Sequence, residues 1–213
     1  TPAIGLGMSM FAFGTFLNAS GFNIYQSFLS TFFAFALPGQ YVMAEILISG
    51  GSLLNVFLAV LLTNARLFPM TMHVMPIIRQ TENTKWKYFL VCHFIAVTAW
   101  INLINRYQKI NIKARYDYFV GLGGTLWLVS VLCTLLGFIF SKFISKDLLL
   151  AMVFFNPLYF LIMTIKTIKE KNIAKVCLIS ASISPVLYNI SKDWGILCAG
   201  IISGTIIFMI KEK

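Results

Sequence analysis

The sequence predicts an all-α, multi-pass membrane protein, and three observations lead to this fold class. The chain of 213 residues is 59% hydrophobic and 11% charged, whereas soluble domains carry about 25% charged residues. The charges are clustered, and no Asp, Glu, Lys or Arg precedes Glu45. The charge-free runs approach the roughly 20 apolar residues that a helix needs to cross a bilayer. This pattern excludes a soluble enzyme, a secreted disulfide scaffold and a nucleic-acid-binding domain.

The charge-free runs predict about seven or eight transmembrane helices in a single transmembrane domain that covers residues 1–213. We expect helices at about residues 2–18, 24–49, 52–77, 86–106, 117–141, 147–167, 173–191 and 194–211. One re-entrant segment among them would leave seven full crossings instead of eight. The chain begins at Thr1 without a basic stretch, so we expect a short preceding segment rather than a signal peptide.

The distribution of Lys and Arg predicts the orientation of these helices. The net charge is +10, and the basic residues lie in the connections between apolar runs, as the positive-inside rule requires. If the loops alternate between the two membrane faces, those at 79–87, 142–146 and 192 share one face. The loops at 106–115 and 166–175 share the other face with the C-terminus, and this second set is richer in Lys and Arg. We therefore expect both termini on the cytoplasmic side of the membrane.

Two of the predicted helices are interrupted. Pro38-Gly39 breaks the second run, and Pro157 breaks the sixth. A proline inside a helix removes a backbone donor, and the carbonyl that it frees needs protein or water as a partner within a bilayer. Gly5-Leu6-Gly7 recurs as Gly121-Leu122-Gly123, 116 residues later, and Pro38 and Pro157 lie 119 residues apart. The spacing indicates an internal repeat, parallel or inverted; chance recurrence of Gly and Pro is the alternative.

The residues at the two interruptions are candidates for substrate binding. Unwound backbone and amide side chains can bind both the carboxylate and the ammonium group of an amino acid. The alternative role for such amides is structural bridging between helices. The candidate substrate-binding residues are Pro38, Gly39, Gln40, Asn156 and Tyr159.

A second set of polar residues within the apolar runs is a candidate for coupling or for the substrate pathway, because such residues are costly in a membrane. Each member also has a structural alternative. Arg66 could extend to the membrane surface, Glu45 could pair with Arg66 or with backbone amides, and His93 could be a packing residue. The candidates are Glu45, Asn64, Arg66 and His93. With no other carboxylate well inside a run, Glu45 is the predicted proton carrier, provided that it is buried.

The final run contains the pattern Gly200-x-x-x-Gly204, which allows close approach of another helix. That helix belongs either to a partner subunit or to this chain. The sequence shows no His-Glu-x-x-His, no Gly-x-Ser-x-Gly and no aspartate pair inside an apolar run, so we expect no enzymatic activity, cofactor or metal site.

In the order and spacing of its motifs, the chain from about residue 4 to residue 168 resembles the AzlC family, the large subunits of bacterial branched-chain amino acid exporters. Phe35-Ala36-Leu37-Pro38-Gly39-Gln40 is similar to the family's Phe-Ala-Gly-Ala-Ser-Gln, and Asn64-Ala65-Arg66 to its Asn-x-Arg. Pro76, Tyr118–Gly123, Leu135–Gly137 and Phe155–Phe160 also resemble AzlC segments.

The resemblance implies proton-driven export of leucine, isoleucine and valine by a secondary transporter, together with a small AzlD-like membrane subunit. One departure concerns the fourth run, which carries no acid after His93, where AzlC proteins usually have an acidic pair. The alternative function is therefore a non-transporting membrane assembly subunit, or a transporter for a different small substrate.

Overall fold

The computed structural model describes residues 2–79, 85–145, 147–148, 151, 154, 158, 161–162, 165, 171–190 and 195–211. The chain divides into two compact units, Thr1–Asn156 and Pro157–Lys213, and each is described by itself. Every secondary-structure element among the described residues is a helix, which confirms the predicted all-α class.

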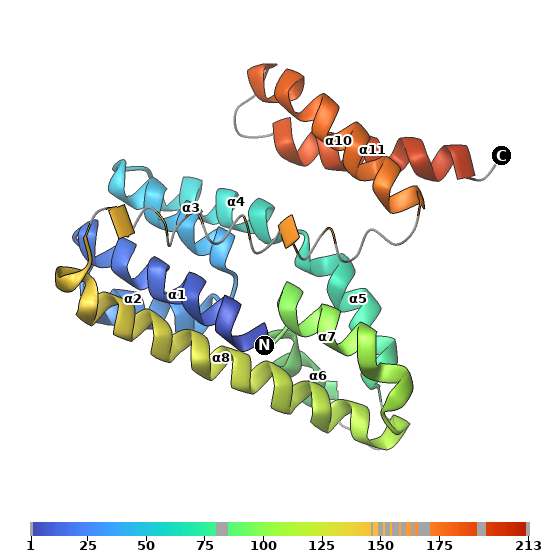
Figure 1. Cartoon of the computed structure of the whole chain (residues 1–213), viewed down its shortest axis with the longest axis horizontal. Helices are drawn as coiled ribbons and strands as arrows, with labels where there is room; N and C mark the ends of the chain where they lie inside the picture. The colour runs from blue at the N-terminus through green and yellow to red at the C-terminus, as the bar shows by residue number, and fades with distance from the viewer. Residues whose placement is uncertain are drawn as a thin grey trace. The chain divides into compact units, whose positions relative to one another are not determined.

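In the first unit the helices follow one another with short connections (Figure 1). Their bounds are α1 Pro2–Ala19, α2 Ile24–Phe33, α3 Leu37–Ile48, α4 Leu53–Asn64, α5 Leu67–Ile78, α6 Lys85–Cys92, α7 Val97–Arg106 and α8 Arg115–Phe140. Three short 3-10 turns, Tyr107–Lys109, Ile112–Ala114 and Ser141–Phe143, flank α8. The second unit contains α10 Lys171–Ile190 and α11 Gly195–Lys211, which pack against each other.

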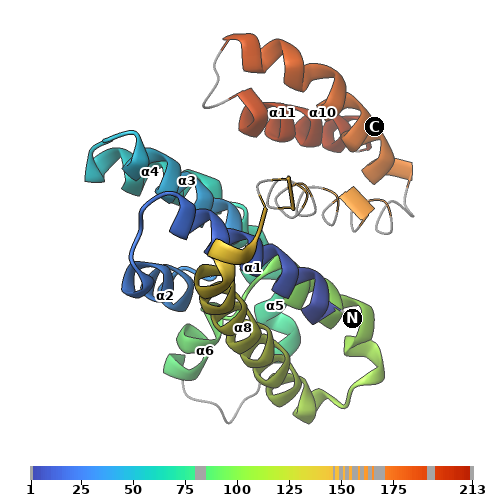
Figure 2. The same ribbon diagram turned by 60° about the vertical axis from the view of Figure 1, so that its left-hand side comes forward.

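Helices α1 and α8 form the central pair of the first unit and run side by side in the same direction (Figures 1 and 2). They approach so closely at two glycines that a Cβ atom at Gly14 would collide with the backbone of Thr134, and one at Gly137 with the backbone of Phe11. The close approach permits two interhelical hydrogen bonds. Thr15 Oγ1 donates to the carbonyl of Gly137 at 3.1 Å, and Asn18 Nδ2 donates to the carbonyl of Phe138 at 3.1 Å.

Four of the predicted helices agree with the structure to within a few residues. The runs 2–18 and 117–141 correspond to α1 and α8, and the runs 173–191 and 194–211 correspond to α10 and α11. The interruption predicted at Pro38-Gly39 is confirmed as a break between α2 and α3. The chain leaves helical geometry at residues 34–36, and Pro38 occupies the first turn of α3, where its missing N–H costs no helical hydrogen bond.

The runs 52–77 and 86–106 were each predicted as one helix, and this is wrong for both. The first divides into α4 and α5, which are bent by 49° at Ala65-Arg66, and the second into α6 and α7, bent by 116°. Pro69 lies in the first turn of α5, so this proline marks the start of a helix rather than its end. The interruption predicted at Pro157 and most of the run 147–167 lie outside the described residues.

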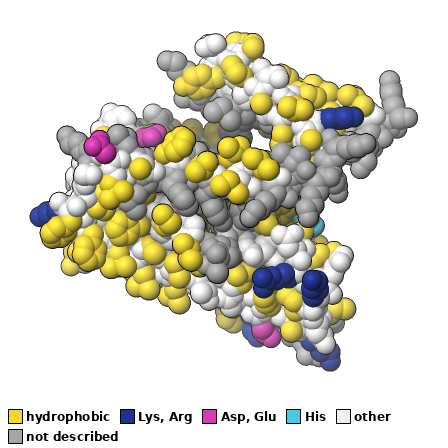
Figure 3. Space-filling model, viewed as in Figure 1, with side chains coloured by type: hydrophobic (Ala, Val, Ile, Leu, Met, Phe, Trp, Pro, Cys, Tyr) yellow, Lys and Arg dark blue, Asp and Glu magenta, His cyan; other side chains and the backbone are white. Residues whose placement is uncertain are grey.

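By length and composition, two described helices can cross a membrane, Ile112–Phe143 and Ile173–Ile190, and the number rises to four if each bent pair is one span. This is fewer than the predicted seven or eight. The difference arises because the second run forms two short helices, because the apolar helices Ala3–Ala19 and Cys198–Ile210 are shorter than a full span, and because part of the chain between residues 146 and 170 is outside the described residues. The abundant apolar surface of the first unit in Figure 3 is consistent with a membrane protein.

The interrupted runs fold into two hairpins that approach α8 from its opposite ends. Gln40 Nε2 in α3 donates to Thr31 Oγ1 in α2 at 3.0 Å, although nine residues of continuous helix would separate them by about 13 Å along its axis. The α2/α3 pair therefore folds back on itself, and α2 begins near the Phe140 end of α8, directly after α1. The outer ends of the α6/α7 hairpin lie at the Arg115 end, because the rings of Tyr88 and Tyr116 are 5.7 Å apart.

Candidate functional site

The tips of the two hairpins meet on one side chain of α8, Trp127. Its Nε1 donates to the carbonyl of Phe32, in the last turn of α2, at 3.1 Å. The ring of Phe32 lies 4.8 Å from the indole, and the rings of His93 and Phe94, at the tip of the α6/α7 hairpin, lie 6.0 and 6.2 Å from it. Trp127 thus connects two breaks that are 60 residues apart in the sequence, from about residue 35 to about residue 95.

Two helices begin at these tips without side-chain caps. The residues before α3 and α7, Ala36 and Ala96, form no capping hydrogen bond. By contrast α2 and α4, which begin away from the tips, are capped by Asn23 and Ser52. The first turn of a helix carries unsatisfied N–H groups and a partial positive charge, so an uncapped start can bind an anion.

The uncapped start of α3 is buried. Leu37 is 4% exposed and Gln40 is 1% exposed, and Pro38 contributes no N–H. The N–H groups of Leu37 and Gly39 donate to no acceptor among the described residues. Buried N–H groups are almost always paired. The start of α3 is therefore a buried position in the described first unit at which a ligand or an ordered water would satisfy backbone donors.

A chain of hydroxyl groups holds the Gln40 side chain in place. Gln40 Nε2 donates to Thr31 Oγ1 at 3.0 Å, Thr31 Oγ1 donates to Thr134 Oγ1 at 3.2 Å, and Thr134 Oγ1 donates to the carbonyl of Ser130 at 2.9 Å. Thr31 and Thr134 are both fully buried. This chain uses the amide nitrogen of Gln40 and leaves its Oε1 oxygen without a hydrogen-bond partner.

Further unpaired polar atoms lie on the neighbouring bend between α4 and α5. The Asn64 side chain packs so tightly on Gly39 that a Cβ atom there would lie 2.6 Å from Asn64 Nδ2. Among the described side chains, the buried atoms without a partner are Gln40 Oε1, Tyr41 OH, Asn64 Oδ1 and Arg66 Nε. All four belong to residues at or near the α3 start or the α4/α5 bend. The set combines oxygen acceptors suited to an ammonium group with N–H donors suited to a carboxylate.

The structure therefore brings together part of the predicted site. Pro38, Gly39 and Gln40 lie at the start of α3, and Asn64 contacts Gly39. Arg66 lies at the α4/α5 bend, inside the broken run rather than at the end of a helical span. His93 is placed separately, at the other hairpin tip beside Trp127.

For three further sets of predicted residues, the described structure shows no place in this group. Glu45 is exposed in the last turn of α3, so the burial on which its predicted proton-carrier role depended is not found within the described first unit. The reason is that α3 is only a half-length helix, which brings Glu45 close to its end. Gly200 and Gly204 belong to α11 in the second unit. Asn156 and Tyr159 lie outside the described residues, as does Pro157.

The sequence analysis missed the residues of α8 that complete the site. Trp127, Ser130 and Thr134 recur at spacings of three and four, between Gly123 and Gly137, and this spacing places all five on one helix face. Four of these five residues are fully or almost fully buried, and Trp127 is partly buried. A polar and small-residue stripe with helical period in an apolar run is the signal that could have identified this face.

Two comparisons with known proteins found nothing, and one found a family. No curated protein and no solved structure matches the chain. The family model described as AzlC protein matches residues 2–144, which is more than half of the chain. The matched region contains α1 to α8, both hairpin tips and Trp127. The chain therefore belongs to the AzlC family.

Proposed function

We propose that the chain is the transport subunit of a secondary transporter that exports branched-chain, or similarly apolar, amino acids across the bacterial inner membrane. Membership of the AzlC family supports a transport role related to branched-chain amino acids, in a family associated with transporters and not with enzymes. The fold adds interrupted helices, and the start of one of them, α3, lies in the interior of the first unit. Such discontinuous helices are the usual location of substrate sites in secondary transporters.

One observation carries the proposal, namely the buried and unsatisfied polar group at the start of α3. An amino-acid carboxylate would accept hydrogen bonds from the N–H groups of Leu37 and Gly39, and Arg66 would add a positive charge. The ammonium group would donate to the unpaired oxygens of Gln40 and Asn64. The neighbouring Phe13, Phe35 and Leu37 are buried and would surround an aliphatic side chain.

An open groove between α1 and α8 is an alternative location for the amino-acid substrate, but its lining is unsuitable. It has a volume of about 550 Å³ and is lined by Ala3, Ile4, Gly7, Met8, Phe11, Val129 and Cys133. None of these side chains can pair with a carboxylate or an ammonium group, so a zwitterion would lose its hydration there without compensation. The polar group at the α3 start is the better site.

Proton coupling is assigned in this proposal to His93. Histidine changes its charge between about pH 5 and 8, and His93 lies beside Trp127, which also contacts the tip of the α2/α3 hairpin. A change of charge at His93 would therefore act on the contact that joins the two hairpins. Glu45, which is exposed near the end of α3, has no comparable position.

The proposal includes a small AzlD-like partner subunit that docks on α11. Ala199 and Ser203 are buried on this helix, so the small-residue stripe that they form is already covered within this chain. A Cβ atom at Gly200 or at Gly204 would meet nothing within 4 Å, so the Gly200/Gly204 stripe is open to another helix.

Ligand-induced stabilisation of the purified chain by leucine tests the proposed site, because a ligand that binds only the folded state raises its stability. We expect Gln40→Ala to weaken leucine binding about 10- to 100-fold, since a hydrogen bond to a charged group contributes about 1.5–3 kcal/mol. Arg66→Lys should also weaken binding, because lysine lacks the planar donor group of arginine.

The matched control for Gln40→Ala is Ser9→Ala. Ser9 in α1 is also buried, its hydroxyl donates to the carbonyl of Gly5 in its own helix, and it belongs neither to the α3 start nor to the α4/α5 bend. The control variant should bind leucine like the wild type. A Gln40→Ala protein that still responds to leucine as the wild type does would remove the α3 start from the substrate site.

A second candidate function is that of a membrane assembly subunit that does not transport. It is favoured by the absence of acidic side chains from both hairpin tips among the described residues, where a proton-coupled carrier often has one. Leucine flux into vesicles that contain the chain, with and without its partner subunit, separates the two functions. A subunit that does not transport would give no flux in either preparation, although it would still recruit its partner.

A further inference from the structure

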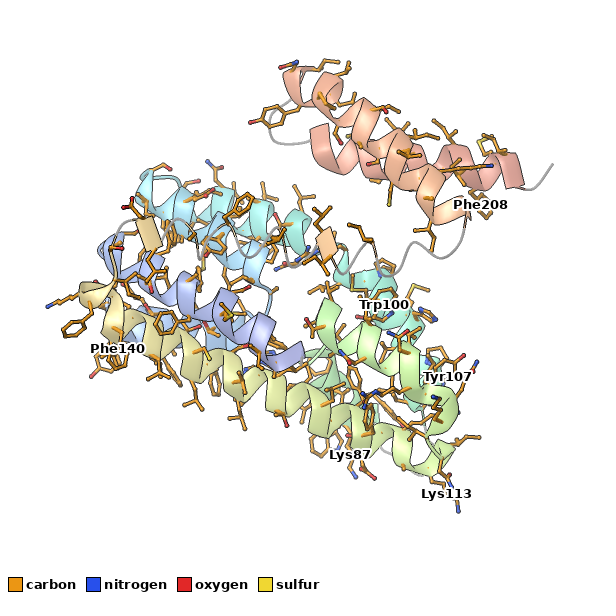
Figure 4. The ribbon with its side chains drawn as sticks, in the orientation of Figure 1. Lys87, Trp100, Tyr107, Lys113, Phe140 and Phe208 are labelled. Carbon is orange, nitrogen blue, oxygen red and sulfur yellow. The ribbon has the colours of Figure 1, made fainter. Side chains whose placement is uncertain are left out.

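The α6/α7 hairpin brings together two basic segments that alternating loops would place on opposite membrane faces. The aromatic rings of Tyr88 in α6 and Tyr116 in α8 are 5.7 Å apart. The guanidinium of Arg115 lies 5.2 Å above the ring of Tyr107, which directly follows α7. The start of α6 and the end of α7 therefore both lie at the Arg115 end of α8. Figure 4 shows Lys87, Tyr107 and Lys113 at this end, and Phe140 at the other end of α8.

The result is a concentrated positive surface, which we call the basic face. Its members are Lys87, Arg106, Lys109, Lys113 and Arg115. The first four are exposed, whereas Arg115 is half-buried and donates from Nε to the carbonyl of Ile110 at 3.3 Å. Among the described residues, Asp117 in the first turn of α8 is an acid close in sequence to Lys113 and Arg115. Figure 3 shows Lys and Arg side chains at the same end of the first unit, with an acidic side chain beside them.

The surroundings of the basic face are those of a membrane interface. Trp86 is 61% exposed and Ile112 is 64% exposed, and both are neighbours in sequence of basic-face residues. Trp and Tyr beside Lys and Arg are typical of the level of the lipid headgroups. A soluble anion would make no favourable contact with these apolar neighbours. An anionic phospholipid places phosphate over the cations and acyl chain beside the apolar groups, so it fits both features.

We propose that the basic face binds the phosphate headgroups of anionic phospholipids at one membrane surface. The site goes beyond the proposed transport function and does not depend on it. Bound lipid would hold the two outer ends of the α6/α7 hairpin together against α8. Because the tip of the same hairpin carries His93 and Phe94 beside Trp127, the lipid would also steady the contact between the two hairpin tips.

The test compares the unfolding temperature of the full chain in detergent after addition of phosphatidylglycerol or phosphatidylcholine. The double variant Lys87→Gln, Lys109→Gln removes one cation from each arm of the hairpin. The control Lys142→Gln, Lys175→Gln removes two exposed cations elsewhere in the chain. We expect phosphatidylglycerol to stabilise the wild type and the control more than phosphatidylcholine does, and the Lys87/Lys109 variant to lose most of that difference.

Two further measurements distinguish binding of lipid from binding of any anion. Added salt should reduce the effect of phosphatidylglycerol, because the attraction is between charges, and inorganic phosphate at equal ionic strength should stabilise no more than chloride. The amount of phosphatidylglycerol retained on the washed protein gives a second readout if a variant is less stable. Equal effects of the two lipids, an undiminished effect in the Lys87/Lys109 variant, or full stabilisation by phosphate alone would each overturn the proposal.

Discussion

The close contact between α1 and α8 leads to a stability prediction for the substitution Gly137→Ala. A Cβ atom at Gly137 would collide with the backbone oxygen and carbon of Phe11. Backbone atoms cannot move aside as the end of a flexible side chain can, so α1 must shift away from α8. The shift would also weaken the hydrogen bonds from Thr15 to the Gly137 carbonyl and from Asn18 to the Phe138 carbonyl.

The magnitude follows from three effects. Overpacking of a tight contact costs about 1–3 kcal/mol, and each weakened interhelical hydrogen bond in a membrane protein about 0.6 kcal/mol. Alanine favours the helix over glycine by about 1 kcal/mol, which offsets part of this loss. We therefore expect Gly137→Ala to lower the free energy of unfolding by about 1–3 kcal/mol. The unfolding temperature should fall by about 2–4 °C for each kcal/mol, as for globular chains of this length.

The assay is thermal unfolding of the purified chain in one detergent, followed by circular dichroism. Gly124→Ala is the matched control, because Gly124 lies in the same helix and a Cβ atom there would meet nothing within 4 Å. The control gains the helix propensity of alanine without the collision, so it should be as stable as the wild type or more stable. If the Gly137→Ala and Gly124→Ala proteins unfold at the same temperature, the close packing of α1 on α8 does not exist in solution.

Two further predictions concern coupling and the partner subunit. His93→Gln should abolish the dependence of leucine flux on a pH gradient while leucine exchange continues, whereas Glu45→Gln should leave pH-driven flux intact. Uphill leucine flux in vesicles measures both effects. The opposite pattern would return the coupling role to Glu45. The double substitution Gly200→Leu, Gly204→Leu should weaken co-purification with the small partner subunit in a detergent pull-down, because the leucines fill the open stripe on α11. Recovery of the partner at the wild-type ratio would exclude α11 as the docking helix.

The amino-acid sequence by itself determined the fold class, the family and one half of the candidate site. Long charge-free runs can be satisfied only as helices in a bilayer, because every backbone polar group must be paired there. Pro38 located the α2/α3 break because proline restricts the helix wherever the chain folds. Gln40 was found because it follows the Pro38-Gly39 interruption, and Asn64 and Arg66 because polar residues are rare and costly in such runs.

The tertiary structure decided how the runs bend and what meets at the bends. The break between α6 and α7 contains neither Pro nor Gly in the stretch His93-Phe94-Ile95-Ala96, so no local signal marks it. It is stabilised by contacts distant in sequence, chiefly Phe94 against Gly123 and His93 against Trp127. The same bend puts Lys87 beside the 106–115 connection, which a count of alternating loops assigned to opposite faces. A charge-free run specifies that a segment is buried in lipid. The direction that the chain takes after a bend in such a segment is decided by the helices packed against it.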